Sequence, residues 1–204
     1  MSETTARRGR PATVDRHRVA ATALRLFTDE GFGNVTMDDV AVACGVGRRT
    51  LFRLFPSKAA MVWGGSGEAR DAIDGVLAAA GDVTLPEALD VVRGAFVASS
   101  TFPPEALEVT RQRLCLIAGD EELLSWGTSS IGTSAASVAE FLSRAEGAAQ
   151  SSLRARSLAA ACAAANFAAL VWWAQSAPER DPAGVVDEAL THLLDGARTW
   201  AAQG

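Results

Sequence analysis

The chain has 204 residues, of which 49% are hydrophobic and 21% charged, so it is long enough to bury a core and too apolar to be disordered. Alanine makes up about a fifth of the residues and tyrosine is absent, which favours helices and excludes an extensive sheet. The three cysteines, Cys44, Cys115 and Cys162, lie far apart and are accompanied by only two histidines, which excludes a disulfide framework and a tetrahedral metal site. We therefore expect an all-α protein without metal or cofactor.

The formal net charge of −5 conceals opposite charges in two parts of the chain. The first sixty residues carry ten Lys and Arg against six Asp and Glu, a net of +4, whereas the rest carries nine against eighteen, a net of −9. This asymmetry predicts a small anion-binding module joined to a larger domain with another task. We expect a flexible basic arm over residues 1–12, the anion-binding domain over 13–62 and the second domain over 63–204.

No segment of the sequence predicts export or insertion into a membrane. The polar start of the chain carries Arg7, Arg8 and Arg10 but is not followed by an apolar region. The longest apolar run, Leu158–Ala174, is interrupted by Asn166 and is shorter than the ~20 residues that cross a bilayer. We expect this run to form a buried helix of a cytoplasmic protein.

The first part of the chain contains four predicted helices. Threonines can cap the first two, and a glycine follows each of them. In chain order the expected elements are Val14–Glu30 between Thr13 and Gly31, a short helix from Thr36-Met37-Asp38-Asp39 to Gly45, a segment starting at Gly47-Arg48-Arg49-Thr50, and a helix opened by Pro56-Ser57-Lys58.

The second part also consists of predicted helices. The stretch Gly64-Gly65-Ser66-Gly67 should break or bend the fourth helix, close to the expected domain boundary. The next helices start at Thr84-Leu85-Pro86-Glu87, Pro103-Pro104-Glu105 (to about Ala118) and Asp120-Glu121-Glu122 (to about Trp126), and the last three span Ser129–Glu146, Ser151–Ser176 and Asp181–Ala202.

Two short helices between Thr36 and Lys58, joined by a turn at Gly45, are typical of a helix-turn-helix. The first helix braces the second, which can enter a DNA major groove, where arginine binds guanine and a threonine methyl contacts thymine. Thr36 and Lys58 lie at helix starts that suit phosphate oxygens. An ordinary helix pair with solvated arginines is the alternative. The apolar contacts expected between the helices are Val40, Ala41, Val46 and Leu51, and the side chains expected at base edges are Arg48, Arg49, Thr50 and Arg53.

Several stretches of this region follow the pattern of a known family. They are Ala23-Leu24-Arg25-Leu26-Phe27, Gly31-Phe32, Thr36-Met37-Asp38-Asp39-Val40-Ala41, Cys44-Gly45-Val46-Gly47 and Thr50-Leu51-Phe52-Arg53-Leu54-Phe55-Pro56-Ser57-Lys58. Together they resemble the DNA-binding domain of TetR-type transcriptional regulators. The resemblance implies a three-helix helix-turn-helix domain followed by a larger helical ligand-binding and dimerisation domain. It implies DNA contacts at Thr36, Gly47, Arg48, Arg49, Thr50, Phe52, Arg53 and Lys58.

The chain departs from that family at three positions of the motif. The family usually has serine or threonine at the position of Gly47, tyrosine at Phe52 and often histidine at Leu54. Two hydroxyl contacts to phosphate are therefore lost, which leaves the three arginines a larger share of the binding. The block from Gly47 to Arg53, with Ser57-Lys58 and Trp63-Gly64, is most similar to the regulators of the mycofactocin system, which implies an effector of the acyl-coenzyme A type.

The resemblance also implies that the last helices form a ligand pocket and a dimer face. The last two predicted helices have alanine-rich faces that permit a four-helix interface between two copies, and an intramolecular core helix is the alternative. A homodimer through these helices would place two recognition helices about 34 Å apart on a palindromic operator. The alanines concerned are Ala161, Ala164, Ala165, Ala168 and Ala169.

Candidate ligand-binding residues combine large apolar side chains with two arginines. Arg111 or Arg113 could meet a carboxylate or phosphate of a ligand, and a salt bridge with Glu108 is the alternative. The aromatic candidates are Trp126, Phe167, Trp172 and Trp173, for which plain core packing is the alternative. His17 and His192 have no partner at catalytic spacing, so we expect no catalytic residue and no enzyme.

These features predict a ligand-responsive repressor that binds operator DNA as a homodimer and is released by a small-molecule effector. A small-molecule or acyl-carrier binding protein without DNA control is the alternative. Salt dependence separates the two, because binding through several phosphates weakens steeply with salt.

Overall fold

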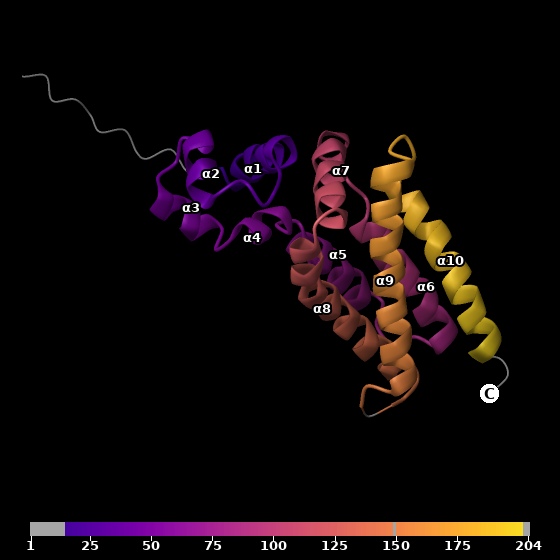
Figure 1. The fold of residues 1–204 in the computed structure, drawn as a ribbon. Helices are drawn as coiled ribbons and strands as arrows, with labels where there is room; N and C mark the ends of the chain where they lie inside the picture. The colour runs from indigo at the N-terminus through magenta and orange to yellow at the C-terminus, as the bar shows by residue number, and fades with distance from the viewer. Residues whose placement is uncertain (1–14, 149, 202–204) are drawn as a thin grey trace, which may run out of the picture. The chain divides into compact units, whose positions relative to one another are not determined.

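The computed structural model describes residues 15–148 and 150–201, the side chains at 128–130 and 197–201 excepted. Over these residues the chain forms ten helices and no strand, which confirms the expected all-α class (Figure 1). Its contacts group into two compact units, Met1–Met61 and Val62–Gly204, called here the N-terminal and C-terminal units. The basic arm expected over 1–12 and the cap expected at Thr13 lie outside the described residues.

The N-terminal unit is built from short helices around an aromatic core. Its fully buried side chains include Leu24, Leu51 and Phe55, and the rings of Phe27 and Phe32 meet edge to face at 5.2 Å. The helices are α1 (Arg16–Glu30), α2 (Met37–Cys44), α3 (Arg48–Leu54) and the start of α4 (Lys58–Val62).

The first helix starts later than the sequence analysis predicted. Asp15, not Thr13, is its N-cap, and the Asp15 carboxylate accepts a hydrogen bond from the backbone N–H of His17 at 2.9 Å. An aspartate satisfies a free N–H of the first turn as well as a threonine does. Gly31 follows the helix as expected, with φ +89°.

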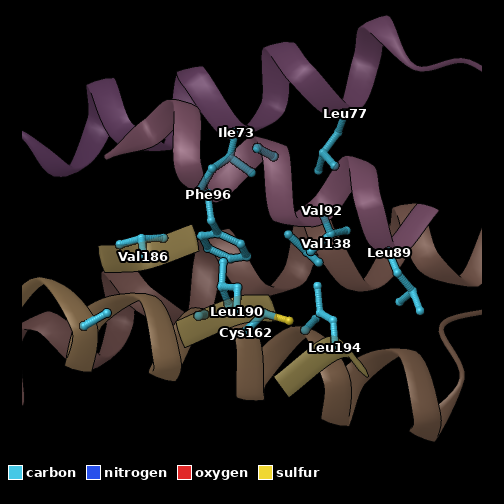
Figure 2. Packing of buried hydrophobic residues seen from close by; sticks show 14 of the residues in the cluster. Ile73, Leu77, Leu89, Val92, Phe96, Val138, Cys162, Val186, Leu190 and Leu194 are labelled. Atoms are coloured by element: carbon cyan, nitrogen blue, oxygen red, sulfur yellow. The ribbon is translucent and has the colours of Figure 1, made fainter. Parts of the chain in front are cut away.

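The C-terminal unit consists of six longer helices. They pack around a shared apolar core, in which α9 contacts α7, α8 and α10, while α6 contacts α5, α8 and α10. Figure 2 shows part of this core, where Phe96 lies among side chains from α5, α8, α9 and α10. The helices are α5 (Ser66–Ala79), α6 (Leu85–Ser99), α7 (Pro104–Ala118), α8 (Glu121–Ala145), α9 (Leu153–Ser176) and α10 (Pro182–Ala201).

Two helices predicted on either side of Gly127 form one continuous helix, α8. The prediction of a break there was wrong. Gly127 serves instead as a point of close approach, since a Cβ at this residue would lie 1.9 Å from the Trp63 ring. A glycine in a helix interior is tolerated where another side chain must contact the backbone.

The helix α9 is the one helix among the described residues with the length and composition to cross a membrane, a test that core helices of soluble proteins also pass. It has 24 residues, so it extends beyond the apolar run Leu158–Ala174. Its buried side chains, which include Ala159, Cys162 and Trp173, face the neighbouring helices of the unit. Burial raises the pKa of the Cys162 thiol to about 12. We therefore assign α9 as a core helix.

Candidate DNA-binding helix and candidate effector cavity

The turn between α2 and α3 has the geometry of a helix-turn-helix. Gly45 adopts the left-handed conformation (φ 64°, ψ 30°), which a glycine reaches without steric cost. The backbone N–H of Val46 then donates to the carbonyl of Ala41 at 3.0 Å, so the chain reverses within two residues. Val40 and Leu51 are fully buried, which fixes α3 against α2 as expected.

The opposite face of α3 is open to solvent. Arg48, Arg49, Phe52 and Arg53 are exposed, while Thr50 is half-buried. Arg49 and Arg53 form no ion pair with any described residue, so their guanidinium groups keep all donors available. These positions share one face because side chains three or four residues apart are neighbours on a helix.

Arg48 is tethered within the N-terminal unit. Its guanidinium pairs with the Asp38 carboxylate at 2.5 Å and lies 5.4 Å from the centroid of the Phe52 ring. Both partners of the pair remain more than half exposed, so the pair adds little stability. It holds Arg48 near the start of α3, where the N-cap Gly47 supplies no side-chain hydrogen bond.

Thr36 caps α2, as predicted, through a reciprocal capping box. Its hydroxyl accepts from the Asp39 backbone N–H at 3.2 Å and donates to the Asp39 carboxylate at 2.6 Å. That carboxylate also accepts from the Thr36 backbone N–H at 2.8 Å. These hydrogen bonds from Thr36 lower the pKa of Asp39. The Thr36 hydroxyl is therefore already engaged within the protein.

Lys58 has a structural role within the N-terminal unit. Its ammonium group donates to the Phe32 carbonyl at 2.6 Å and lies 4.4 Å from the centroid of the Phe32 ring. An ammonium group has three donors, so this hydrogen bond leaves capacity for a phosphate. The sequence predicted the DNA role of Lys58 but not its internal partner.

The C-terminal unit contains a mostly apolar cavity of about 150 Å³ that is partly open to solvent. It lies among α5, α6, α7, α8 and α9, next to the connection between α4 and α5. Aromatic and aliphatic side chains form most of the wall, and a few polar groups interrupt it. The polar lining residues are Ser66, Ser99, Thr110, Arg113, Ser134 and Asn166, and the aromatic ones are Trp63, Phe96, Phe102 and Phe167.

Trp63 occupies a fixed position at this cavity. Its indole N–H donates to the carbonyl of Leu123 at 3.0 Å, and its ring stacks on Phe167 with centroids 5.9 Å apart. The Trp126 ring lies on it at 6.2 Å, and Gly127 leaves room for its edge. A buried tryptophan with its N–H satisfied is held rigidly. The residue that follows α4 is thus anchored to α8 and α9.

The sequence-predicted ligand residues fall into two groups. Arg113 and Phe167 line the cavity. Trp126 does not line it; its ring packs on that of Trp63 and is 43% exposed. Arg111, Trp172 and Trp173 are not among the lining residues.

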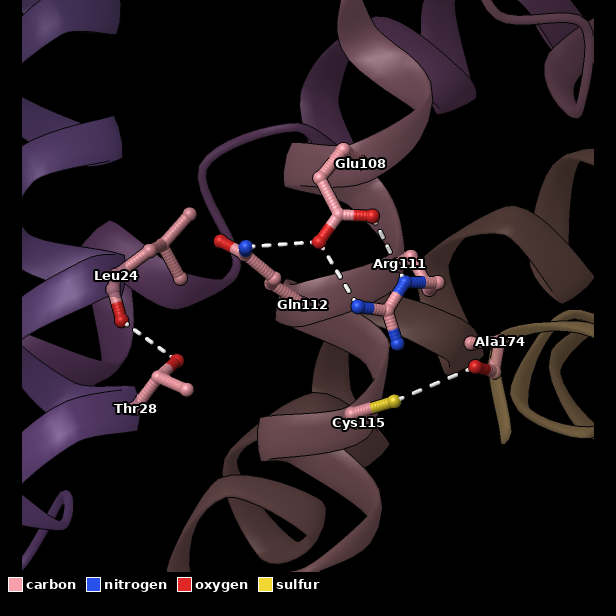
Figure 3. A network of polar contacts seen from close by, with 7 residues as sticks. All are labelled: Leu24, Thr28, Glu108, Arg111, Gln112, Cys115 and Ala174. Atoms are coloured by element: carbon pink, nitrogen blue, oxygen red, sulfur yellow. Dashed lines mark hydrogen bonds and ion pairs between the residues drawn. The ribbon is translucent and has the colours of Figure 1, made fainter. Parts of the chain in front are cut away.

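The residues outside the cavity have other partners. Figure 3 shows Arg111 paired with Glu108, to which Nε and Nη2 donate at 2.9 and 2.8 Å. The same hydrogen bonds lower the pKa of Glu108. Trp173 is buried and donates to the Arg180 carbonyl at 2.8 Å, whereas Trp172 is 46% exposed beneath the Arg180 guanidinium.

Sequence reasoning missed Trp63, Gly65, Thr110 and Asn166 as cavity residues. Asn166 and Trp63 could have been found from the sequence. Asn166 interrupts the longest apolar run, and a polar side chain inside a buried helix needs a partner, which is the Ser100 hydroxyl at 3.1 Å. Trp63 and Gly65 belong to the glycine-rich segment after α4, where an apolar ring has no periodic pattern to explain it.

The alanines of α9 divide between the core and the surface. Ala164 and Ala168 are exposed, Ala161 and Ala165 are half-buried and Ala169 is buried. With exposed Trp172 they form an apolar strip along α9 at spacings of three to four residues. This strip is available to a partner, and Ala169 packs inside the unit.

Two family models match most of the described chain. Residues 20–62 match the model of the bacterial regulatory proteins of the tetR family, and residues 86–198 match the MftR C-terminal domain. A protein of Mycobacterium tuberculosis (strain ATCC 25618 / H37Rv), assigned as the mycofactocin biosynthesis transcriptional regulator MftR, is 31% identical over 139 residues, which span 68% of this chain and 69% of that protein.

Solved structures of the same fold cover most of the chain. One is Thermus thermophilus FadR, a TetR family transcriptional repressor in complex with lauroyl-CoA, which is 24% identical with a TM-score of 0.56 and is aligned over 89% of this chain and 94% of that one. Another is the fatty acid degradation regulator FadR of Bacillus halodurans, which is 14% identical with a TM-score of 0.61, over 89% and 99% of the two chains.

The two matching family models cover the helix-turn-helix and the cavity-bearing helices in turn. Members of this family are transcriptional regulators, not enzymes. The chain belongs to the TetR family of transcriptional regulators and carries a C-terminal domain of the MftR type.

Proposed function

We propose that this protein is a repressor that binds a palindromic operator through α3 as a homodimer and is released when a small molecule occupies the C-terminal cavity. The observation that carries the proposal is the exposed arginine face of α3. Arg49 and Arg53 are exposed and form no ion pair with a described residue, while the buried Leu51 packs the other face of α3 into the unit. A guanidinium group in this state can bind guanine bidentately. The proposed location is the cytoplasm, where operator DNA is reached.

The residues expected to contact DNA differ in whether their side chains already have partners within the protein. Arg49 and Arg53 are assigned to base edges, and Thr50 sits between them on the half-buried side. Arg48 and Phe52 act as one tethered pair at the helix start, with Gly47 bringing the backbone N–H groups of the first turn within reach of a phosphate. Lys58 contributes to phosphate binding with the donors that its bond to Phe32 leaves available. Thr36 was also expected at a phosphate, but its hydroxyl hydrogen is donated to Asp39, so its role here is to cap α2.

The homodimer is proposed to form through α9 and α10. The exposed strip of α9, with Ala164, Ala168 and Trp172, offers close helix approach and one large apolar side chain. Two such helix pairs make an isologous four-helix interface. Replacing Ala164 with glutamate should give a monomer by light scattering and abolish tight operator binding. The matched control is Gln175→Ala, an exposed position on the same helix, which should leave the dimer intact.

The experiment that tests the proposal is selection of random duplexes by the full-length protein. A palindromic consensus is expected, and binding to it should weaken steeply with salt because several phosphates are neutralised. A small-molecule binding protein without DNA control would give no consensus. Selection of a single, non-palindromic site would contradict the homodimer but leave DNA reading in place.

The effector is proposed to act through the anchored Trp63. A ligand in the cavity contacts the residues that hold the end of α4, so a ligand that favours a different position of Trp63 changes the population of DNA-binding conformations. The acyl-coenzyme A class remains the implication of the sequence resemblance and stays a prediction. Dissociation of the operator complex by a panel of small molecules is the direct test.

A further inference from the structure

Arg113 is an unusual wall residue of the cavity. Its Nε is buried and has no hydrogen-bond partner among the described residues, and the residue forms no ion pair with them. Arg111, two residues earlier on α7, is fully paired with Glu108 at the surface. The same helix therefore carries one guanidinium group that is paired with a carboxylate and one whose buried Nε has no acceptor.

An arginine in this state favours an anionic ligand. The guanidinium group stays protonated in proteins, and a donor such as Nε that is buried without an acceptor is costly. Burial lowers the pKa of Arg113, and the charge of exposed Glu68 on α5 opposes this shift only from a distance. A carboxylate that accepts from Nε and one Nη of the same edge would satisfy both donors.

A second polar group of the wall also favours an acceptor ligand. The Asn166 side-chain oxygen accepts from Ser100, which leaves its NH₂ group as the part able to bind a ligand. The hydroxyl of Ser99 donates to the Phe96 carbonyl at 2.8 Å and therefore offers a ligand no donor. Arg113 and Asn166 thus present donors to a space that is bounded mostly by apolar side chains.

The size of the cavity limits the ligand. Its volume is about 150 Å³, and apolar protein cavities of about that volume take up benzene. The nucleotide portion of an acyl-coenzyme A is far larger and would have to lie outside the cavity, and the acyl end of a thioester carries no negative charge to pair with Arg113.

We propose that the effector is a compact carboxylic acid with an apolar body about the size of a benzene ring, held by a bidentate pair between its carboxylate and Arg113. This proposal rests on the proposed function, because it names the ligand of the same cavity. Arg113 selects the acid, and the aromatic wall selects the apolar body.

The test uses the full-length protein with benzoate and hexanoate as probes, and benzamide and hexanamide as their neutral counterparts. By calorimetry without DNA, at least one acid is expected to bind about tenfold or more tightly than its amide. In Arg113→Gln this preference should disappear. Arg111→Gln removes a charge from the same helix at the surface and should leave acid binding unchanged.

A second pair of variants moves the charge without removing it. A Cβ at Gly65 would lie 2.9 Å from Nη1 of Arg113, so Gly65→Ala must displace the guanidinium group. Acid binding should weaken by a smaller factor than in Arg113→Gln. Gly67→Ala has open space around its Cβ and should match the wild type.

The outcomes separate this proposal from the proposed function. Three results would overturn the carboxylate proposal: neither acid binds, acid and amide bind equally, or Arg113→Gln binds the acid like the wild type. This holds whether or not another ligand, such as benzoyl-CoA, releases the operator. If the acid binds through Arg113 but the protein selects no operator, the carboxylate proposal holds and the repressor function fails.

Discussion

The two units place arginine in opposite environments. On α3 of the N-terminal unit, Arg49 and Arg53 lie in water, where an unpaired charge costs little and can meet any phosphate or base edge that approaches. In the C-terminal unit, Arg113 lies against a cavity with its Nε buried and unpartnered. An exposed arginine can therefore bind an anion without lowering the stability of the free protein. An arginine at an interior cavity binds an anion only because the free protein tolerates a destabilising, unpartnered donor.

The largest effect is expected for Arg49→Ala on operator binding. Loss of a bidentate contact to guanine should cost about 1–3 kcal/mol on the selected operator and much less on a scrambled duplex. Lys58→Ala is the counterpart and should weaken both duplexes to a similar extent. Fluorescence anisotropy at one fixed salt concentration measures all four affinities. Equal losses on both duplexes for both variants would contradict the division between base and phosphate contacts.

The next effect concerns the tight packing of the C-terminal unit, which contrasts with the open face of α3. Gly127→Ala forces a Cβ into the Trp63 ring, 1.9 Å from its nearest atom, and should destabilise the protein by about 1–3 kcal/mol. Gly132→Ala in the same helix meets open space and should instead be neutral or stabilising by up to about 1 kcal/mol. Urea denaturation gives both values, and equal effects of the two changes would show that the ring is not fixed.

A smaller effect tests the comparison between the two kinds of arginine directly. Arg113→Met keeps the apolar stem and removes the guanidinium group with its buried, unpartnered Nε, so the ligand-free protein should gain about 1 kcal/mol and its Tm should rise by about 2–4 °C. Arg49→Met should leave the Tm within the error of measurement because that side chain is exposed. Calorimetry of the two variants would refute the comparison if Arg113→Met lowered the Tm.

The smallest effect is expected at the capping box of α2. Thr36→Ala should cost about 1 kcal/mol of unfolding free energy, because a helix N-cap is lost. Circular dichroism during urea titration measures it. Ser at the same position keeps the hydroxyl and should restore most of the loss, and failure to do so would exclude the cap as the cause.

The same cap predicts an acid dependence. Asp39 has a pKa below its ordinary 3.8 in the folded protein, so its contribution is complete above 3.8 and is lost as the pH falls through the lowered value. Thr36→Ala removes the hydroxyl's hydrogen bonds and should flatten the pH profile of stability in this acid range. An unchanged profile would show that Asp39 is not linked to α2 folding.

The candidate DNA site could be predicted almost entirely from the sequence, because its parts are local. Thr36, Gly45 and the arginines of α3 act within one or two helical turns of their neighbours, so capping and turn preferences place them. The internal partners of Arg48 and Lys58 could not be predicted, since Asp38 lies on the preceding helix and Phe32 in the connection between α1 and α2.

The cavity could be predicted only in part. Arg111 and Arg113 lie two residues apart on α7, so they point to different faces of the helix, but the sequence does not say which face turns to the cavity. The tertiary structure turns Arg113 towards α5 and α9 and leaves Arg111 beside Glu108. The continuous α8 has the same origin, because the ring that approaches Gly127 comes from Trp63, more than sixty residues earlier in the chain.

By itself the sequence determined the all-helical class, the helix starts marked by Thr36 and Thr84, and the cationic face of α3, because helix propensity, capping and side-chain periodicity act over a few residues. The tertiary structure alone decided which arginine lines the cavity, which glycine admits a ring and where the cavity lies. These depend on contacts between helices distant in the chain, and such contacts are set by the packing of the whole unit.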